Sequence, residues 1–83
     1  MNTPINPKRI RWACRRGMLE LDVLLLPFFE KTFEQLTPTE QQGFVALLGE
    51  SDQDLYNWLL GKALPSDPAY VHLVQKIRGI NGL

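Results

Sequence analysis

The sequence is poor in the residues that build metal centres and covalent cross-links. Its 83 residues include one cysteine, Cys14, and one histidine, His72. A single cysteine excludes an internal disulfide, and the absence of a disulfide framework is typical of proteins of the reducing cytoplasm. A metal cluster or a Cys–His catalytic pair would have to be made from these two residues alone. We therefore expect a cytoplasmic protein without a metal site, and we find no catalytic constellation, so we expect no enzyme.

Long hydrophobic runs and glycine-rich loops are also lacking. The longest apolar stretch, residues 21–29, is interrupted by Asp22 and Pro27 and is far shorter than the ~20 residues that span a bilayer. The amino-terminal residues show no apolar core or cleavage site of a secretion signal. The six glycines lie at positions 17, 43, 49, 61, 79 and 82, never in the close spacing that holds a phosphate. We expect neither a membrane span nor a stably bound nucleotide cofactor.

No stretch alternates apolar and polar residues in the manner of a strand, whereas helix starts are clearly marked. Three of them pair a capping residue with proline at the first helical position, as in Asn6-Pro7, Thr37-Pro38 and Asp67-Pro68. Glu40 completes a capping box with Thr37. Ser51 begins a further helix without the proline.

These signals predict an all-α, compact five-helix bundle with short loops, formed as a single domain by residues 1–83, with residues 1–5 as a flexible amino-terminal segment. The predicted helices cover residues 7–16, 18–35, 38–48, 52–60 and 68–78, and glycines at 49, 61 and 79 are expected to close the last three. Pro27 is expected to bend the second helix without breaking it. The second helix carries the main core stripe, which comprises Leu21, Leu24, Leu25, Phe28, Phe29, Phe33 and Leu36.

The net charge is zero, but the charges are unevenly distributed. Residues 1–20 contain five basic residues and one acidic residue, while residues 21–83 contain four basic and eight acidic residues. Such an electrical dipole steers the encounter with a charged partner more than it determines the fold.

The first predicted helix has two distinct faces. Its apolar side is formed by Ile10, Ala13 and Cys14, and Trp12 lies in the middle of the opposite, basic side. That basic side is formed by Lys8, Arg9, Arg11, Arg15 and Arg16. A tryptophan among cations either stacks under an arginine in a cation–π contact or serves as a binding hot spot. We favour the binding interpretation.

The corner between the first two helices concentrates charge. We expect Arg15 and Arg16 in the last turn of the first helix and Glu20 in the first turn of the second, each suited to its end of the macrodipole. Gly17 between them is suited to the left-handed conformation that ends a helix. A simpler interpretation is that Arg16 and Glu20 pair only with each other, which would contribute about 0 to 1 kcal/mol.

Residues 16–20 form the motif Arg-Gly-x-x-Glu, preceded by Trp12-Ala13-Cys14-Arg15 and followed by the acidic and aromatic segment 54–59. In these motifs the chain resembles the SdhE/YgfY family, the flavinylation assembly factors of succinate dehydrogenase. The resemblance covers nearly the whole chain, and Leu19 departs from it, since relatives often carry a basic residue there.

The resemblance implies a small helical assembly factor that binds the flavoprotein subunit of succinate dehydrogenase, and of fumarate reductase, and promotes covalent attachment of FAD to a histidine of that subunit. FAD would then belong to the partner. The motif implies that Arg16, Gly17 and Glu20 contact the partner. The helical projection adds Trp12, Arg9 and Arg15 as the rim of the same surface.

Two other functions fit a short helical module with a basic first helix. One is a nucleic-acid-binding module, and the other is a toxin-neutralising, antitoxin-like partner. The acidic remainder of the chain argues against a DNA reader, because no later helix gathers the side chains that read base edges.

Overall fold

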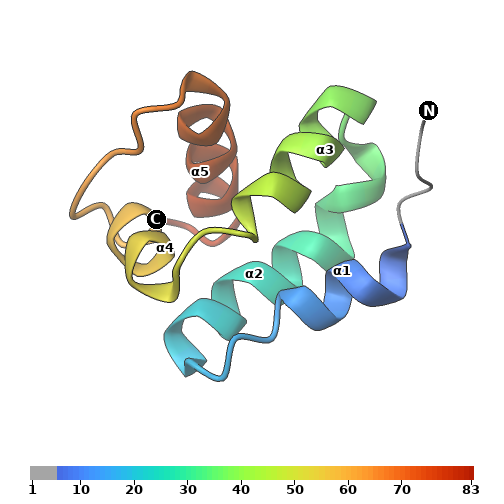
Figure 1. Ribbon diagram of the computed structural model, residues 1–83, viewed down its shortest axis with the longest axis horizontal. Coiled ribbons are helices and arrows are strands. Elements are labelled where there is room, and N and C mark those ends of the chain that lie inside the picture. The colour runs from blue at the N-terminus through green and yellow to red at the C-terminus, as the bar shows by residue number, and fades with distance from the viewer. Residues whose placement is uncertain (1–5) are drawn as a thin grey trace.

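The computed structural model describes residues 6–83, which form five α-helices and one turn of 3₁₀-helix (Figure 1). The predicted flexible segment, residues 1–5, lies outside the described residues. No strand occurs between residues 6 and 83, so the predicted all-α class is confirmed. The elements are α1 (Pro7–Ala13), α2 (Leu19–Thr32), η1 (Phe33–Gln35), α3 (Pro38–Leu47), α4 (Asp52–Leu59) and α5 (Pro68–Ile80).

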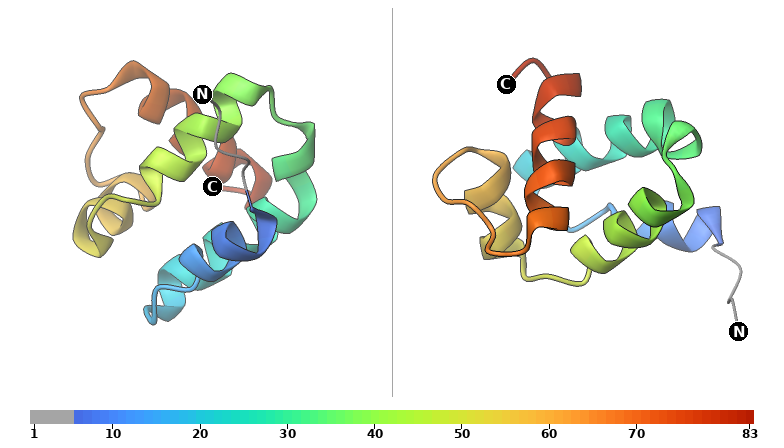
Figure 2. Two further views of the ribbon diagram at one scale, coloured as in Figure 1. Left: turned by 45° about the vertical axis from the view of Figure 1, so that its right-hand side comes forward. Right: turned by 90° about the horizontal axis from the view of Figure 1, so that it is seen from above.

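Helix α2 runs through the middle of the arrangement. Helix α1 lies in front of it in Figure 1 and in the left view of Figure 2, and the ion pair between Arg11 and Glu30 joins the two helices. Helices α4 and α5 also pack on α2. Helix α5 also packs on α3 and α4. The short α4 therefore has α2 and α5 as neighbours, and this brings the turns at its two ends close to both helices. Within the described residues, no helix has the length and apolar character needed to cross a bilayer.

The core follows the predicted stripe of α2. Leu21, Leu25 and Phe28 are fully buried, while Leu24 and Phe29 pack against the core from its margin. Aromatic rings continue the core into η1 and α3, through the contacts between Phe28, Phe33 and Phe44 with centroid separations of 5.4 and 5.7 Å. Each fully buried side chain of this size contributes about 1.5–3 kcal/mol.

The buried face of α1 also matches the prediction. Ile10 and Cys14 are buried. Burial raises the pKa of the Cys14 thiol to about 12, so that the thiol stays protonated and unreactive at neutral pH. Cys14 is therefore a packing residue that attaches the end of α1 to the core.

The four predicted helix starts are confirmed in detail. Asn6 and Asp67 accept hydrogen bonds from the N–H groups of Lys8 and Ala69. Ser51 Oγ accepts one from the N–H of Asp54 at 3.1 Å. The capping box of α3 is complete, since Thr37 Oγ1 accepts from the Glu40 N–H at 3.1 Å and the Glu40 carboxylate accepts from the Thr37 N–H.

The carboxyl ends of the helices differ more from the prediction. Helix α5 continues through Gly79 to Ile80, and the left-handed glycine beyond it is Gly82. The side chain of Asn81 accounts for this extension, because its Nδ2 donates to the carbonyls of Ile77 at 2.8 Å and Leu24 at 3.2 Å. Helix α2 is continuous across Pro27, so the expectation of no break is confirmed.

The Glu40 carboxylate connects α3 to α5. Its Oε1 accepts from the Thr37 N–H at 2.9 Å, and its Oε2 lies 2.7 Å from His72 Nε2 and 2.9 Å from Lys76 Nζ. Three hydrogen bonds lower the pKa of Glu40 from 4.5 to about 2. The largest effect comes from the Thr37 N–H, and His72 and Lys76 contribute less.

Glu40→Gln should therefore reduce stability at neutral pH and have little effect in strong acid. A carboxylate with a depressed pKa stabilises the fold above its ordinary pKa of 4.5, and this contribution disappears as pH falls towards 2. Urea unfolding at several pH values between about 7 and about 2 measures the effect. The gap in unfolding free energy between the two proteins should shrink on acidification, whereas the exposed Glu34→Gln control should show little gap at any pH. A gap that persists in strong acid would contradict the assignment.

Candidate functional site

The corner between α1 and α2 begins one turn earlier than predicted. Helix α1 ends at Ala13 with Cys14 as its C-cap, so Arg15 and Arg16 lie in the connecting turn and not in the helix. The prediction of a helix to residue 16 was therefore wrong. The reason is that the Arg16 N–H donates to Asp22 Oδ1 at 2.7 Å, a side chain of α2, instead of to a carbonyl of α1.

The Arg16 side chain turns inward. Its Nε donates to Asp52 Oδ1 at 2.8 Å, its Nη2 to the Glu50 carbonyl at 2.9 Å, and its Nη1 to the carbonyls of Leu48 and Ala13 at 2.6 and 3.1 Å. The side chain is 17% exposed. The guanidinium therefore joins the end of α1, the α3–α4 turn and the first residue of α4.

The Arg16 guanidinium is therefore engaged inside its own chain, and contact between Arg16 and a partner stays a prediction. A helix leaves its last carbonyls without partners inside the helix. After α3, the planar guanidinium of Arg16 donates hydrogen bonds to the carbonyls of Leu48 and Glu50. The alternative in which Arg16 and Glu20 pair only with each other is wrong, because Asp52 is the carboxylate that Arg16 binds. Arg16 shapes the corner from within.

Gly17 and the residues after it project into solvent. Gly17 has φ +78°, the predicted left-handed conformation, and no heavy atom lies within 4 Å of the place where a Cβ would be. Leu19 is 73% exposed, and Glu20 is exposed in the first turn of α2. Within residues 6–83, the Glu20 carboxylate makes no hydrogen bond or ion pair. An open glycine, an apolar side chain and a carboxylate without an internal partner thus occupy one projecting turn.

Trp12 is 76% exposed on the outer side of α1. The described residues contain a cation–π contact, with Lys62 Nζ 5.1 Å from the Tyr56 ring centroid, but none at Trp12. The stacking explanation for this indole therefore does not hold in residues 6–83. A large amphipathic ring left in water is the side chain type most enriched in binding hot spots.

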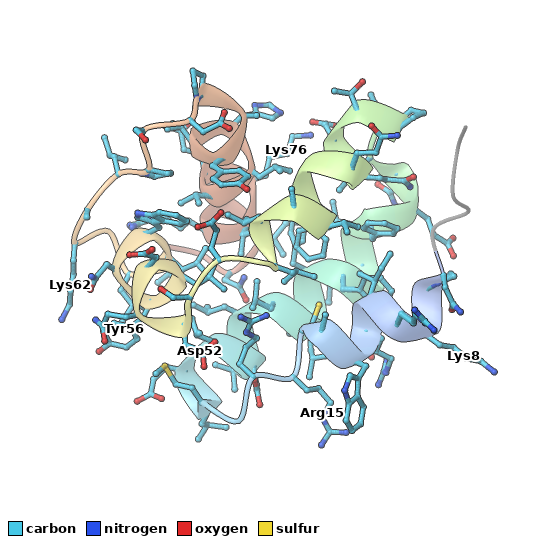
Figure 3. The ribbon with its side chains drawn as sticks, viewed as in Figure 1. Lys8, Arg15, Asp52, Tyr56, Lys62 and Lys76 are labelled. Carbon is cyan, nitrogen blue, oxygen red and sulfur yellow. The ribbon has the colours of Figure 1, made fainter. Side chains whose placement is uncertain are left out.

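The basic side of α1 surrounds this tryptophan. Arg9 and Arg15 are exposed, and Figure 3 shows Arg15 at the edge of the molecule, directed away from the core. Arg11 is paired with Glu30, which attaches α1 to α2. We call the exposed set Arg9, Trp12, Arg15, Gly17, Leu19 and Glu20 the docking corner.

The docking corner also adjoins α4. Figure 3 shows Asp52 and Tyr56 on the side of α4 that lies towards the start of α2. Asp52 is linked to the corner through Arg16, so the first turn of α4 and the α1–α2 turn are joined directly. Sequence reasoning missed Asp22 and Asp52 as the groups that hold the corner, because they contact it only in the folded chain.

The docking corner is suited to binding the surface of another protein and not to enclosing a small molecule. The described part of the chain contains no pocket and no group of three metal-ligating side chains. Small molecules are usually held in concave pockets, whereas proteins dock on exposed patches with aromatic and arginine side chains.

Comparison with known proteins gives the family of the chain as a whole. The model of the family described as "Flavinator of succinate dehydrogenase" matches residues 8–81. The chain is 52% identical over 69 residues to the FAD assembly factor SdhE of Aliivibrio fischeri, covering 83% of this chain and 80% of that protein. It is 46% identical over 81 residues to the FAD assembly factor SdhE of Coxiella burnetii, covering 98% and 99%. A solution structure of a UPF0350 protein, 48% identical, superposes with a TM-score of 0.78 over 98% of this chain and 86% of that one.

Proposed function

The chain belongs to the family of flavinators of succinate dehydrogenase, and we propose that it binds the flavoprotein subunit of that enzyme and promotes covalent attachment of FAD. The flavoprotein of fumarate reductase is a second partner in this proposal. FAD belongs to the partner, and the chain supplies no catalytic group of its own. The single buried, protonated cysteine fits action in the cytoplasm.

The observation that carries the proposal is the construction of the docking corner. Arg16 uses its guanidinium on internal acceptors, and this fixes the turn that presents Gly17 and Glu20. A preorganised surface loses little conformational entropy on binding. Gly17 allows a partner's backbone to approach, and Glu20 offers acceptors for charge-assisted hydrogen bonds.

The proposed mechanism is positioning. FAD supplies the carbon that becomes bonded to the acceptor histidine of the partner. The docking corner holds the partner in the conformation in which these groups are aligned, and alignment of reacting groups lowers a barrier without any catalytic side chain. The antitoxin-like and nucleic-acid-binding alternatives have no support from the family match or from the acidic later helices.

Trp12→Ala tests the docking corner. The indole is 76% exposed and is not among the side chains that pack against the core, so the unfolding midpoint should stay close to that of the wild type. The affinity for the purified flavoprotein subunit should fall by at least about tenfold, or about 1.4 kcal/mol, because truncation of a hot-spot tryptophan typically costs about 2 kcal/mol or more. Isothermal titration calorimetry measures the affinity of the wild type and of Trp12→Ala for the flavoprotein subunit.

Val45→Ala is the matched control, since Val45 is an exposed apolar side chain on α3. Its affinity for the flavoprotein subunit should equal that of the wild type. Equal affinities for the wild type and Trp12→Ala would remove the indole from the interface.

A further inference from the structure

Two basic residues of the described chain are half-buried, and they differ sharply in their surroundings. Arg16 has the acceptors described above, while the Arg78 guanidinium makes no hydrogen bond or ion pair within residues 6–83. Residues 1–5 contain no acidic side chain that could serve it. Arg78 is therefore a partly desolvated cation without a carboxylate of its own chain.

Packing on Gly61 holds Arg78 in place. A Cβ built on Gly61 would lie 3.0 Å from Cζ and 3.1 Å from Nη2 of Arg78, so the guanidinium occupies the space that a side chain at position 61 would need. Gly61 has φ +76° and ends α4, with its N–H donating to the Trp58 carbonyl at 3.2 Å. Lys62 follows directly, over the ring of Tyr56, and lies with it at the outer edge of the molecule (Figure 3).

The carboxyl end of α4 explains only part of this arrangement. The negative end of the helix macrodipole favours a nearby cation. The macrodipole supplies no carboxylate, which is the acceptor whose two oxygens match the N–H donors of a guanidinium. Partial removal of a charged group from water without a partner costs free energy, so a carboxylate supplied by a binding partner would stabilise the Arg78 guanidinium.

We propose that Arg78, seated on Gly61 and flanked by Lys62, binds a carboxylate side chain of the flavoprotein partner. The inference rests on the proposed function and adds a second contact to the docking corner. A protein carboxylate suits this place better than a free anion, because the described residues form no pocket to enclose a small molecule. Guanidinium and carboxylate form paired, parallel hydrogen bonds.

One partner surface is wide enough to reach both contacts. Arg16 binds the first residue of α4 and Arg78 lies at the turn after its last residue. An eight-residue helix is about 12 Å long. A standard interface covers roughly 800 Å² on each partner, which extends well beyond that distance. The length of helix α4 would therefore set the distance between the docking corner and the Arg78 contact.

Arg78→Gln in the full chain is the first test, with the purified FAD-loaded flavoprotein subunit as the probe. Its affinity should be about tenfold lower than that of the wild type at low salt, and the difference should narrow at high salt as the charge pair is screened. The unfolding midpoint should not fall, because the guanidinium bonds nothing in its own chain. Lys31→Gln, which removes an exposed cation of α2, is the matched control and should bind as the wild type does.

Arg78→Lys provides a second, independent measurement. A carbodiimide adds to a carboxylic acid of the partner to give an O-acylisourea. The ε-amine at position 78 attacks the acyl carbon of this ester, so that an amide forms and the reagent leaves as a urea, which carries the oxygen of the carboxyl group. Mass spectrometry of the cross-linked complex should find a bond between position 78 and an aspartate or glutamate of the flavoprotein.

Wild-type affinity for Arg78→Gln, together with no cross-link at position 78 in a complex that forms normally, would overturn this inference and leave the proposed function standing. Failure of the wild-type chain itself to bind the flavoprotein would overturn both.

Discussion

Gly17→Arg is expected to abolish capture of the flavoprotein subunit while the chain stays folded. Nothing lies within 4 Å of the Cβ position, so a long side chain would project outward into the space that the partner's backbone must enter. The left-handed φ of +78° adds strain of about 1–2 kcal/mol, which a domain of this size tolerates. The affinity should fall at least about a hundredfold, or about 2.7 kcal/mol, in a titration calorimetry experiment.

Gly82→Arg separates this effect from backbone strain. Gly82 also has a left-handed φ, of +74°, and also has open space around its Cβ position, but it lies near the carboxyl terminus. The two substitutions should lower the thermal unfolding midpoint to a similar extent. Only the substitution at Gly17 should prevent binding, and loss of binding in both variants would mean that strain or misfolding is the cause.

Arg16→Ala is expected to destabilise the fold itself. The substitution removes the bond to Asp52 and leaves the carbonyls of Leu48 and Glu50 without their donor. Hydrogen bonds that involve a charged group contribute about 1.5–3 kcal/mol each, and the set is not additive, so a loss of about 2–4 kcal/mol in the free energy of unfolding follows. Urea unfolding measures this loss directly.

The neighbouring arginine is the control. Arg15 is exposed and is not hydrogen-bonded through its side chain within residues 6–83, so Arg15→Ala should change stability by no more than about 0.5 kcal/mol. Arg16→Lys should recover part of the stability, because it keeps the charge but not the fork. If Arg16→Ala unfolds at the same urea concentration as the wild type, the internal clamp is not important for the fold.

Much of this fold was predictable because its signals are local. Each cap acts within three residues of its helix start, and the α2 stripe depends only on helical spacing, so Thr37, Ser51 and the core leucines could be assigned from the sequence. The exposure of Trp12 could also be predicted, since its position on α1 is opposite to Ile10.

The role of Arg16 could not be predicted in this way. Its acceptors at Leu48, Glu50 and Asp52 lie 32 to 36 residues away, and they meet the guanidinium only once α2 and α4 have packed together. The early end of α1 has the same origin, because Asp22 on α2 takes the N–H that would have extended the helix. Local propensity was outweighed in both cases by bonds that exist only in the tertiary structure.

Covalent FAD on the flavoprotein subunit is the most direct measure of the whole account. The subunit should be co-expressed with the wild-type chain, with Gly17→Arg or with no assembly factor, and then separated under denaturing conditions and examined for in-gel flavin fluorescence. If the docking corner binds the subunit and promotes flavinylation, fluorescence should be strong with the wild-type chain and at background level in the other two samples. Equal fluorescence in all three samples would contradict it.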